Sequence, residues 1–217
     1  MRSPARRSRK IGLTQGGRVV NGKAHAKWSR VFSRDVWTRL SEECGAGVQL
    51  IVENPSSGYY HPALPDDYRA VLAMLPKGLS RHLRAVVLRR TSRHDGRLGV
   101  EARRRYSCII LNAFPCTRRI STEGRSVAAL RHDCRWGARA VTVNGRSYLE
   151  WPERAVRHYY LYHLFLHELG HINQPSFHKL RRRESFAEDF ALEWARRLGK
   201  LGSGGAAEQG DEADEAW

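Results

Sequence analysis

The chain is poor in cysteine and in long apolar runs, and each shortage argues against a class of protein. Its four cysteines, Cys44, Cys108, Cys116 and Cys134, show no C-x-x-C spacing, which argues against a disulfide scaffold and a cysteine-based metal site. No apolar run is long enough to span a membrane, and none follows the basic start as in a secretory signal. We therefore expect a cytoplasmic protein with free thiols and no membrane partner.

Acidic residues are also scarce: 22 stand against 38 basic ones in 217 residues, for a formal net charge of +16. Residues 1–30 hold nine Lys and Arg and no acid, whereas residues 201–217 hold five acids and no base. We expect two disordered tails, 1–30 and 201–217, on either side of a single domain at 31–200. The basic tail is a candidate nucleic-acid contact, although an Arg-rich composition gives the same pattern without that function.

One pentapeptide carries chemistry: His167-Glu168-Leu169-Gly170-His171 follows the pattern H-E-x-x-H. Residues four apart share one face of a helix, so both imidazoles can bind one cation. Glu168 projects about 100° away around the helix axis, which leaves it within reach of a water at that cation. This layout predicts a zinc site of the metallopeptidase kind, with Glu168 as the catalytic base.

The surrounding sequence favours a buried helix for this motif. A helix is predicted from Arg154 to Ile172, because this stretch contains no proline and is apolar on nearly every side. Pro175 ends it, and a second amphipathic helix is predicted from Leu180 to Leu198. Two histidines and a glutamate are costly within a buried helix unless a metal satisfies them.

Three residues compete to be the third zinc ligand, since a catalytic zinc takes three protein ligands and keeps one position for water. Glu184 is the preferred candidate because it shares a helix face with small alanines that allow close packing. His178, in the segment between the two helices, is its rival. Glu188 is a weaker alternative ligand, and it is better suited to accept a hydrogen bond from a ligand imidazole.

Two motifs now stand in order along the chain, His167-Glu168-x-x-His171 and Glu184-x-x-Ala187-x-x-Phe190-Ala191. Together they resemble the zincin metallopeptidases of the gluzincin type, and among these the ImmA/IrrE-like minimal zincins. The resemblance implies a zincin-like α+β fold, in which a small mixed sheet precedes the active-site helix and a second helix carries the third zinc ligand. It also implies His167, His171 and Glu184 as ligands of Zn2+, Glu168 as general base, and a protein or peptide substrate.

The residues before the motif predict this sheet. Strands are expected at Val48–Glu53, Leu83–Thr91 and Ser107–Phe114, and helices at Ser33–Ser41 and Asp66–Leu75. Asn144-Gly145 between two alternating runs predicts a hairpin. The run Cys108–Phe114 is a candidate edge strand for binding extended substrate, and its apolar composition is equally consistent with a buried central strand.

A non-catalytic protein is the alternative interpretation: a zinc-stabilised module that binds nucleic acid or another protein. Such a site would fill all four zinc positions with protein ligands, for example by adding His178 to the set. Glu168 argues against it, because a purely structural zinc has no use for a base beside the metal.

Overall fold

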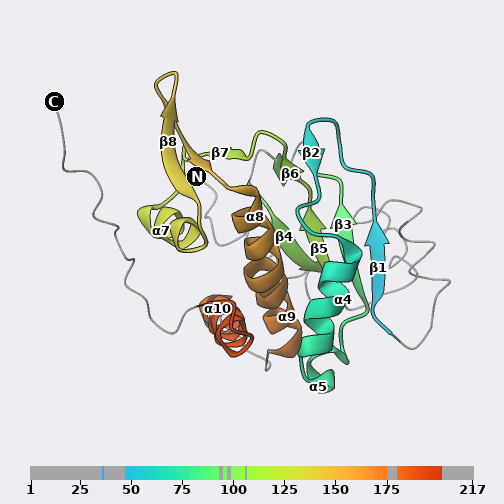
Figure 1. The fold of residues 1–217 in the computed structure, drawn as a ribbon. Coiled ribbons are helices and arrows are strands. Elements are labelled where there is room, and N and C mark those ends of the chain that lie inside the picture. Colours follow the sequence, from blue (N-terminus) through green and yellow to red (C-terminus); the bar gives the residue numbers. More distant parts are fainter. Residues whose placement is uncertain are drawn as a thin grey trace, which may run out of the picture.

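The fold is mixed α+β in the computed structural model of the chain, which describes residues 47–92, 95–96, 99–105, 107–174 and 180–201 together with Val36 (Figure 1). The expected tails fall outside these ranges, except for Leu201, and so does the expected helix Ser33–Ser41 apart from Val36, which is helical.

A four-stranded sheet forms the centre of the fold. β1 (Gln49–Val52), β3 (Ala85–Arg89) and β5 (Cys108–Asn112) run parallel, and β4 (Ala102–Arg105) pairs antiparallel with β5 in the order β1-β3-β5-β4. The expectation that Cys108–Phe114 forms an edge strand is therefore wrong. β5 lies between β3 and β4 and is buried throughout, which confirms the alternative of a buried central strand, and the two edges of this sheet are β1 and the Arg-rich β4.

Alternation along the central strands sends side chains into two apolar clusters. Val86 and Ile109 face the larger cluster, which includes the helices, whereas Val87 and Ile110 face a smaller one that includes Val36. In Figure 1, α4 (Pro65–Met74) and the helical rod that contains α9 lie over the same face of the sheet. Both faces of the two central strands are thus covered, as their continuous apolar sequences require.

Smaller elements complete the scaffold. β2 (Tyr59–Tyr60) pairs with β6 (Phe114–Pro115), and α5 (Lys77–Ser80) is one short turn. β7 (Arg119–Ser121), β9 (Arg146–Glu150) and β8 (Arg139–Val143) form an antiparallel sheet. The hairpin is confirmed at Asn144-Gly145, where both residues have positive φ. The sequence interpretation missed α7 (Val127–Arg135), which Ser126 caps by accepting a hydrogen bond from the backbone of Ala129.

The helix expected from Arg154 to Ile172 is present, but it is not α-helical throughout. α8 (Glu153–Tyr159) continues into a π-helical turn, η1 (Tyr160–Leu164), and then into α9 (Phe165–Asn173). A π turn holds one extra residue, so the 3.6-residue pattern changes phase across it. The second expected helix is α10 (Leu180–Arg197), which packs beside α9.

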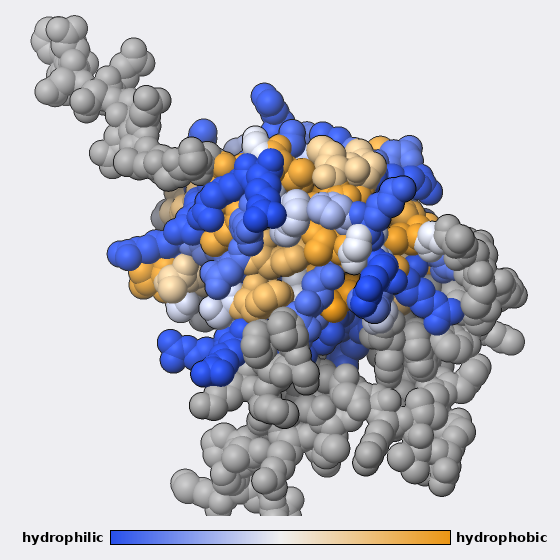
Figure 2. Space-filling model, turned by 90° about the horizontal axis from the view of Figure 1, so that it is seen from below, coloured by the Kyte–Doolittle hydropathy of each residue, from blue (hydrophilic) through white to orange (hydrophobic). Residues whose placement is uncertain are grey.

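Three further observations concern the described residues. No helix within these ranges has the length and apolarity to cross a membrane. Cys108, Cys116 and Cys134 are free thiols, as expected, whereas Cys44 lies outside the described ranges. Viewed from below, hydrophobic residues occupy the middle of the described surface and hydrophilic residues surround them (Figure 2).

Candidate metal centre

The motif histidines lie on one face of α9, as their spacing predicts. Phe165, Leu166 and Leu169 are fully buried and anchor this helix in the core. The rings of His167 and His171 approach edge to face, with centroids 4.8 Å apart. His171 is only 8 % exposed, so water reaches its polar imidazole poorly and the ring nitrogens need a partner within the protein or a metal.

Close packing of α10 against α9 brings the third residue to the histidines. Gly170 faces Ala187 so closely that a Cβ on Gly170 would lie 3.0 Å from the Ala187 Cα. One turn before Ala187, the carboxylate of Glu184 lies 3.6 Å from His167 Nε2 and 3.4 Å from His171 Nε2, measured from Oε2. The small residues at the contact thus set the position of Glu184.

These distances fit a tetrahedral metal site better than a set of hydrogen bonds. Three ligand atoms, one each from His167, His171 and Glu184, lie within 4.8 Å of one another. Ligands held about 2.0–2.2 Å from a tetrahedral zinc are about 3.3–3.6 Å apart. A nitrogen–oxygen distance of 3.6 Å is too long for a good hydrogen bond. The donor set of two imidazoles and one carboxylate, with Glu184 open to solvent, therefore fits Zn2+.

The electrostatics of the site favour positive charge. The neighbouring imidazoles of His167 and then of His171 hold the pKa of the Glu184 carboxyl far below its usual range, although burial opposes this. Burial lowers the pKa of His167, but the carboxylates of Glu184 and Glu188 outweigh it and raise that pKa to about 9. A site that stabilises a proton this strongly is suited to a metal cation, whose binding releases that proton.

Glu168 lies beside this centre in a different environment. Its side chain is nearly buried, 8 % exposed, and burial raises the pKa of its carboxyl, while the neighbouring His167, His171 and Arg104 act in the opposite direction. A carboxylate with a raised pKa is a stronger base than one in water, which suits a group that takes and returns a proton near neutral pH.

Arg104 is a residue of this site that the sequence interpretation missed. On β4 it is opposite Ile109, which faces the helices, whereas Arg103 and Arg105 are opposite Ile110 and Cys108 on the other face. Its Nη1 donates to the carbonyl of His171 at 3.0 Å, and its charge acts on Glu168. The available signal was the Arg103-Arg104-Arg105 run, because alternation in a strand turns the middle residue away from its neighbours.

The other candidates are placed as follows. Glu188 lies with Oε2 3.4 Å from His167 Nδ1, the nitrogen that does not face Glu184. It therefore stands where a carboxylate could orient a ligand imidazole. His178 lies outside the described residues.

Comparisons with protein-family models, with curated proteins and with solved structures found no match to this chain.

Proposed function

We propose that this chain is a zinc-dependent metallopeptidase. The observation that carries the proposal is the convergence of His167, His171 and Glu184 at the spacing of zinc ligands, with Glu168 buried beside them. The order of elements supports a zincin-like version of the α+β fold: a small mixed sheet, the motif helix α9, and then α10 with Glu184. No described helix spans a membrane, which is compatible with a peptidase acting on protein or peptide in solution.

Each residue has a distinct task in this mechanism. His167, His171 and Glu184 would hold the metal, which when bound supplies Lewis acidity toward water and the substrate carbonyl. Glu168 accepts a proton from the attacking water at a carboxylate oxygen and later returns it to the leaving amine nitrogen. Arg104 fixes the end of α9 through the His171 carbonyl and brings a positive charge close to Glu168.

Strand β4 is the element best placed to bind an extended substrate. Within the described ranges it pairs only with β5, and a strand paired on one side alone can accept a further strand on the other. It also lies against α9, as the hydrogen bond from Arg104 to His171 shows. A peptide added to this edge would run beside the metal centre, and we assign to β4 the substrate-binding role that the sequence suggested for Cys108–Phe114.

The test compares the wild type with Glu168→Gln, and with Glu193→Gln as a matched control on an exposed turn of α10. Zinc content is measured by elemental analysis, and cleavage by mass spectrometry of a diverse peptide mixture. We expect all three proteins to contain the same amount of zinc, because neither substitution changes a ligand, and we expect cleavage by the wild type and Glu193→Gln alone. Removal of the general base should reduce cleavage by about 100-fold or more.

Two outcomes would count against the proposal. Zinc in all three proteins without cleavage of any peptide would favour the alternative, a zinc-stabilised module that binds nucleic acid or protein. Cleavage that survives unchanged in Glu168→Gln would show that the activity does not depend on this centre.

A further inference from the structure

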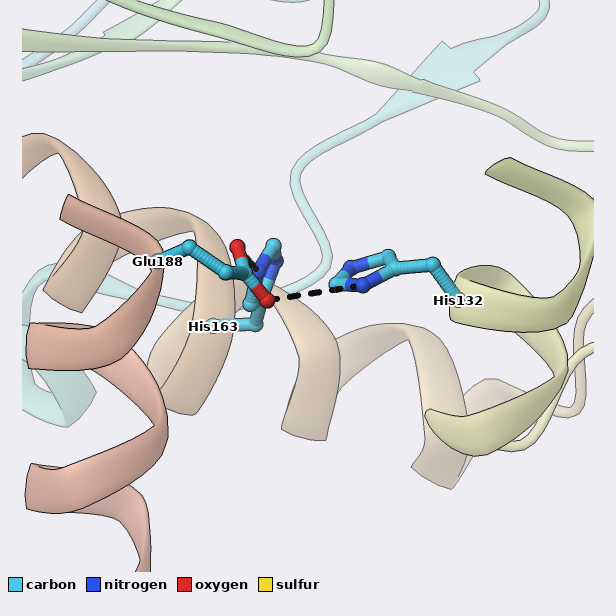
Figure 3. Close-up of side chains that lie close together, drawn as sticks. All are labelled: His132, His163 and Glu188. Atoms are coloured by element: carbon cyan, nitrogen blue, oxygen red, sulfur yellow. Dashed lines mark hydrogen bonds and ion pairs between the residues drawn. The ribbon is translucent and has the colours of Figure 1, made fainter. Parts of the chain in front are cut away.

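A second cluster of metal-ligating side chains lies next to the first. His132 from α7, His163 from η1 and Glu188 from α10 converge, although they are far apart in the sequence (Figure 3). The Glu188 carboxylate lies with Oε2 3.0 Å from His163 Nε2 and with Oε1 3.5 Å from His132 Nδ1. One donor atom from each residue lies within 4.8 Å of the other two.

The cluster is built into the protein rather than spread on its surface. His163 is only 5 % exposed, and its ring stacks on Tyr159 with an interplanar angle of 12°. The rings of His132 and His163 are 4.3 Å apart, and Trp136 packs against His163 on another side. The imidazoles therefore have little freedom to turn away, so their donor atoms are positioned in advance of any ligand.

The chemistry of the three groups matches a transition metal. Two imidazoles and one carboxylate repeat the donor set of the first centre, and the distances of 3.0 Å and 3.5 Å lie around the spacing of about 3.3–3.6 Å expected for ligands of tetrahedral zinc.

We propose that His132, His163 and Glu188 form a second site for a divalent transition metal such as Zn2+, separate from the centre on His167, His171 and Glu184. The inference goes beyond the proposed peptidase, because it concerns metal binding and holds whether or not the first centre is catalytic. The competing explanation is a cluster without metal, in which Glu188 accepts one hydrogen bond, from His163, and His132 only packs beside them.

The test is metal stoichiometry on the full chain. The protein is stripped with a chelator, loaded with Zn2+, passed through a desalting column and analysed for zinc. His132 is the residue to change, because Glu188 also contacts His167 and would disturb both sites. We expect two zinc ions in the wild type and one in His132→Phe, which keeps an aromatic ring beside His163. His158→Phe is the control: His158 also packs on Trp136 but belongs to neither cluster, so we expect two ions.

Loading with Co2+ provides a second measurement that does not depend on how well His132→Phe folds. The wild type should show two successive changes in visible absorption as Co2+ is added, and His171→Ala should lose one of them and keep the other. One ion in the wild type, or two in both the wild type and a folded His132→Phe, would overturn the assignment. A wild type that cleaves peptides but binds only one zinc ion would leave the proposed function standing while refuting the second site.

Discussion

Gly170→Ala tests whether the close approach of α9 and α10 builds the metal centre. A Cβ at position 170 would lie 3.0 Å from Cα of Ala187 and 3.1 Å from Cβ of Phe190, where ordinary contacts are 3.4–4 Å. Because Ala187 Cα is backbone, no side-chain rotation can relieve the clash. Helix α10 must move outward by a few tenths of an ångström, and Glu184 must move with it.

Two opposing effects set the change in stability of the metal-free protein. Alanine in place of glycine favours a helix by about 1 kcal/mol. Overpacking a close contact costs about 1–3 kcal/mol. The free energy of unfolding should therefore fall by between about zero and 2 kcal/mol. The gain in helix propensity does not affect zinc affinity, but the displacement of Glu184 does, because it increases the distance between the Glu184 carboxylate and the metal. We therefore expect zinc affinity to fall by at least about tenfold, which is the loss typical when the support of a metal ligand is disturbed.

The assay is competition for zinc with a chromophoric chelator, combined with thermal unfolding of the stripped protein. Gly78→Ala is the matched control, since Gly78 is also helical but has no described atom within 4 Å of the added Cβ. It should bind zinc as the wild type does and be as stable or slightly more stable. The reasoning is refuted if Gly170→Ala behaves like Gly78→Ala in both measurements.

Three further predictions concern the same scaffold. Glu188→Gln should weaken zinc binding at the first centre by about 10–100-fold, measured by the same competition, because its carboxylate faces His167 Nδ1. Removing zinc that was present at about 100 times its dissociation constant should cost about 2.7 kcal/mol and lower the Tm by about 5–10 °C in calorimetry. Burial raises the pKa of Glu101 from 4.5 to about 7 although Arg125 opposes this, so the folded state retains a proton that the unfolded chain has released, and stability should fall as pH rises from about 4.5 to 7. Urea unfolding should show this fall, on the order of 3 kcal/mol, in the wild type and a much smaller one in Glu101→Gln.

The local sequence pattern was sufficient to predict the helices that carry the candidate metal ligands. Helix α10 ends within a residue of its expected bound, and Asn144-Gly145 forms its hairpin, because both depend on spacing and turn chemistry within a short segment. The same local rule placed His167 and His171 on one helix face. Glu184 followed from its position beside small alanines, which the contact between Gly170 and Ala187 now explains.

The pairing of strands that are distant in the sequence could not be predicted from local pattern. The run Ala102–Arg105 has no apolar alternation, and it is a strand because β5 offers it a partner and α9 a surface for Arg104. The apolar sequence of β5 is consistent with either an edge strand or a central strand of the sheet, and only its neighbouring strands decide between them. His132 lies on α7, which the sequence pattern did not predict, and the second cluster depends on the long-range packing of α7 beside η1.

The two clusters are consequences of one helix-to-helix register. His163, His167 and His171 follow at intervals of four residues, about 6 Å of rise each, and Glu184 and Glu188 repeat that interval on α10. His171 meets Glu184 while His163 meets Glu188, so the order of the contacts along α10 is opposite to their order along α9, and His167 contacts both glutamates through its two nitrogens. A slide of α10 by one turn would move one glutamate to the place of the other and leave the remaining place empty, so one of the two clusters would lose its carboxylate. The Gly170 contact that fixes this register therefore governs both clusters, and Gly170→Ala should weaken metal binding at each of them.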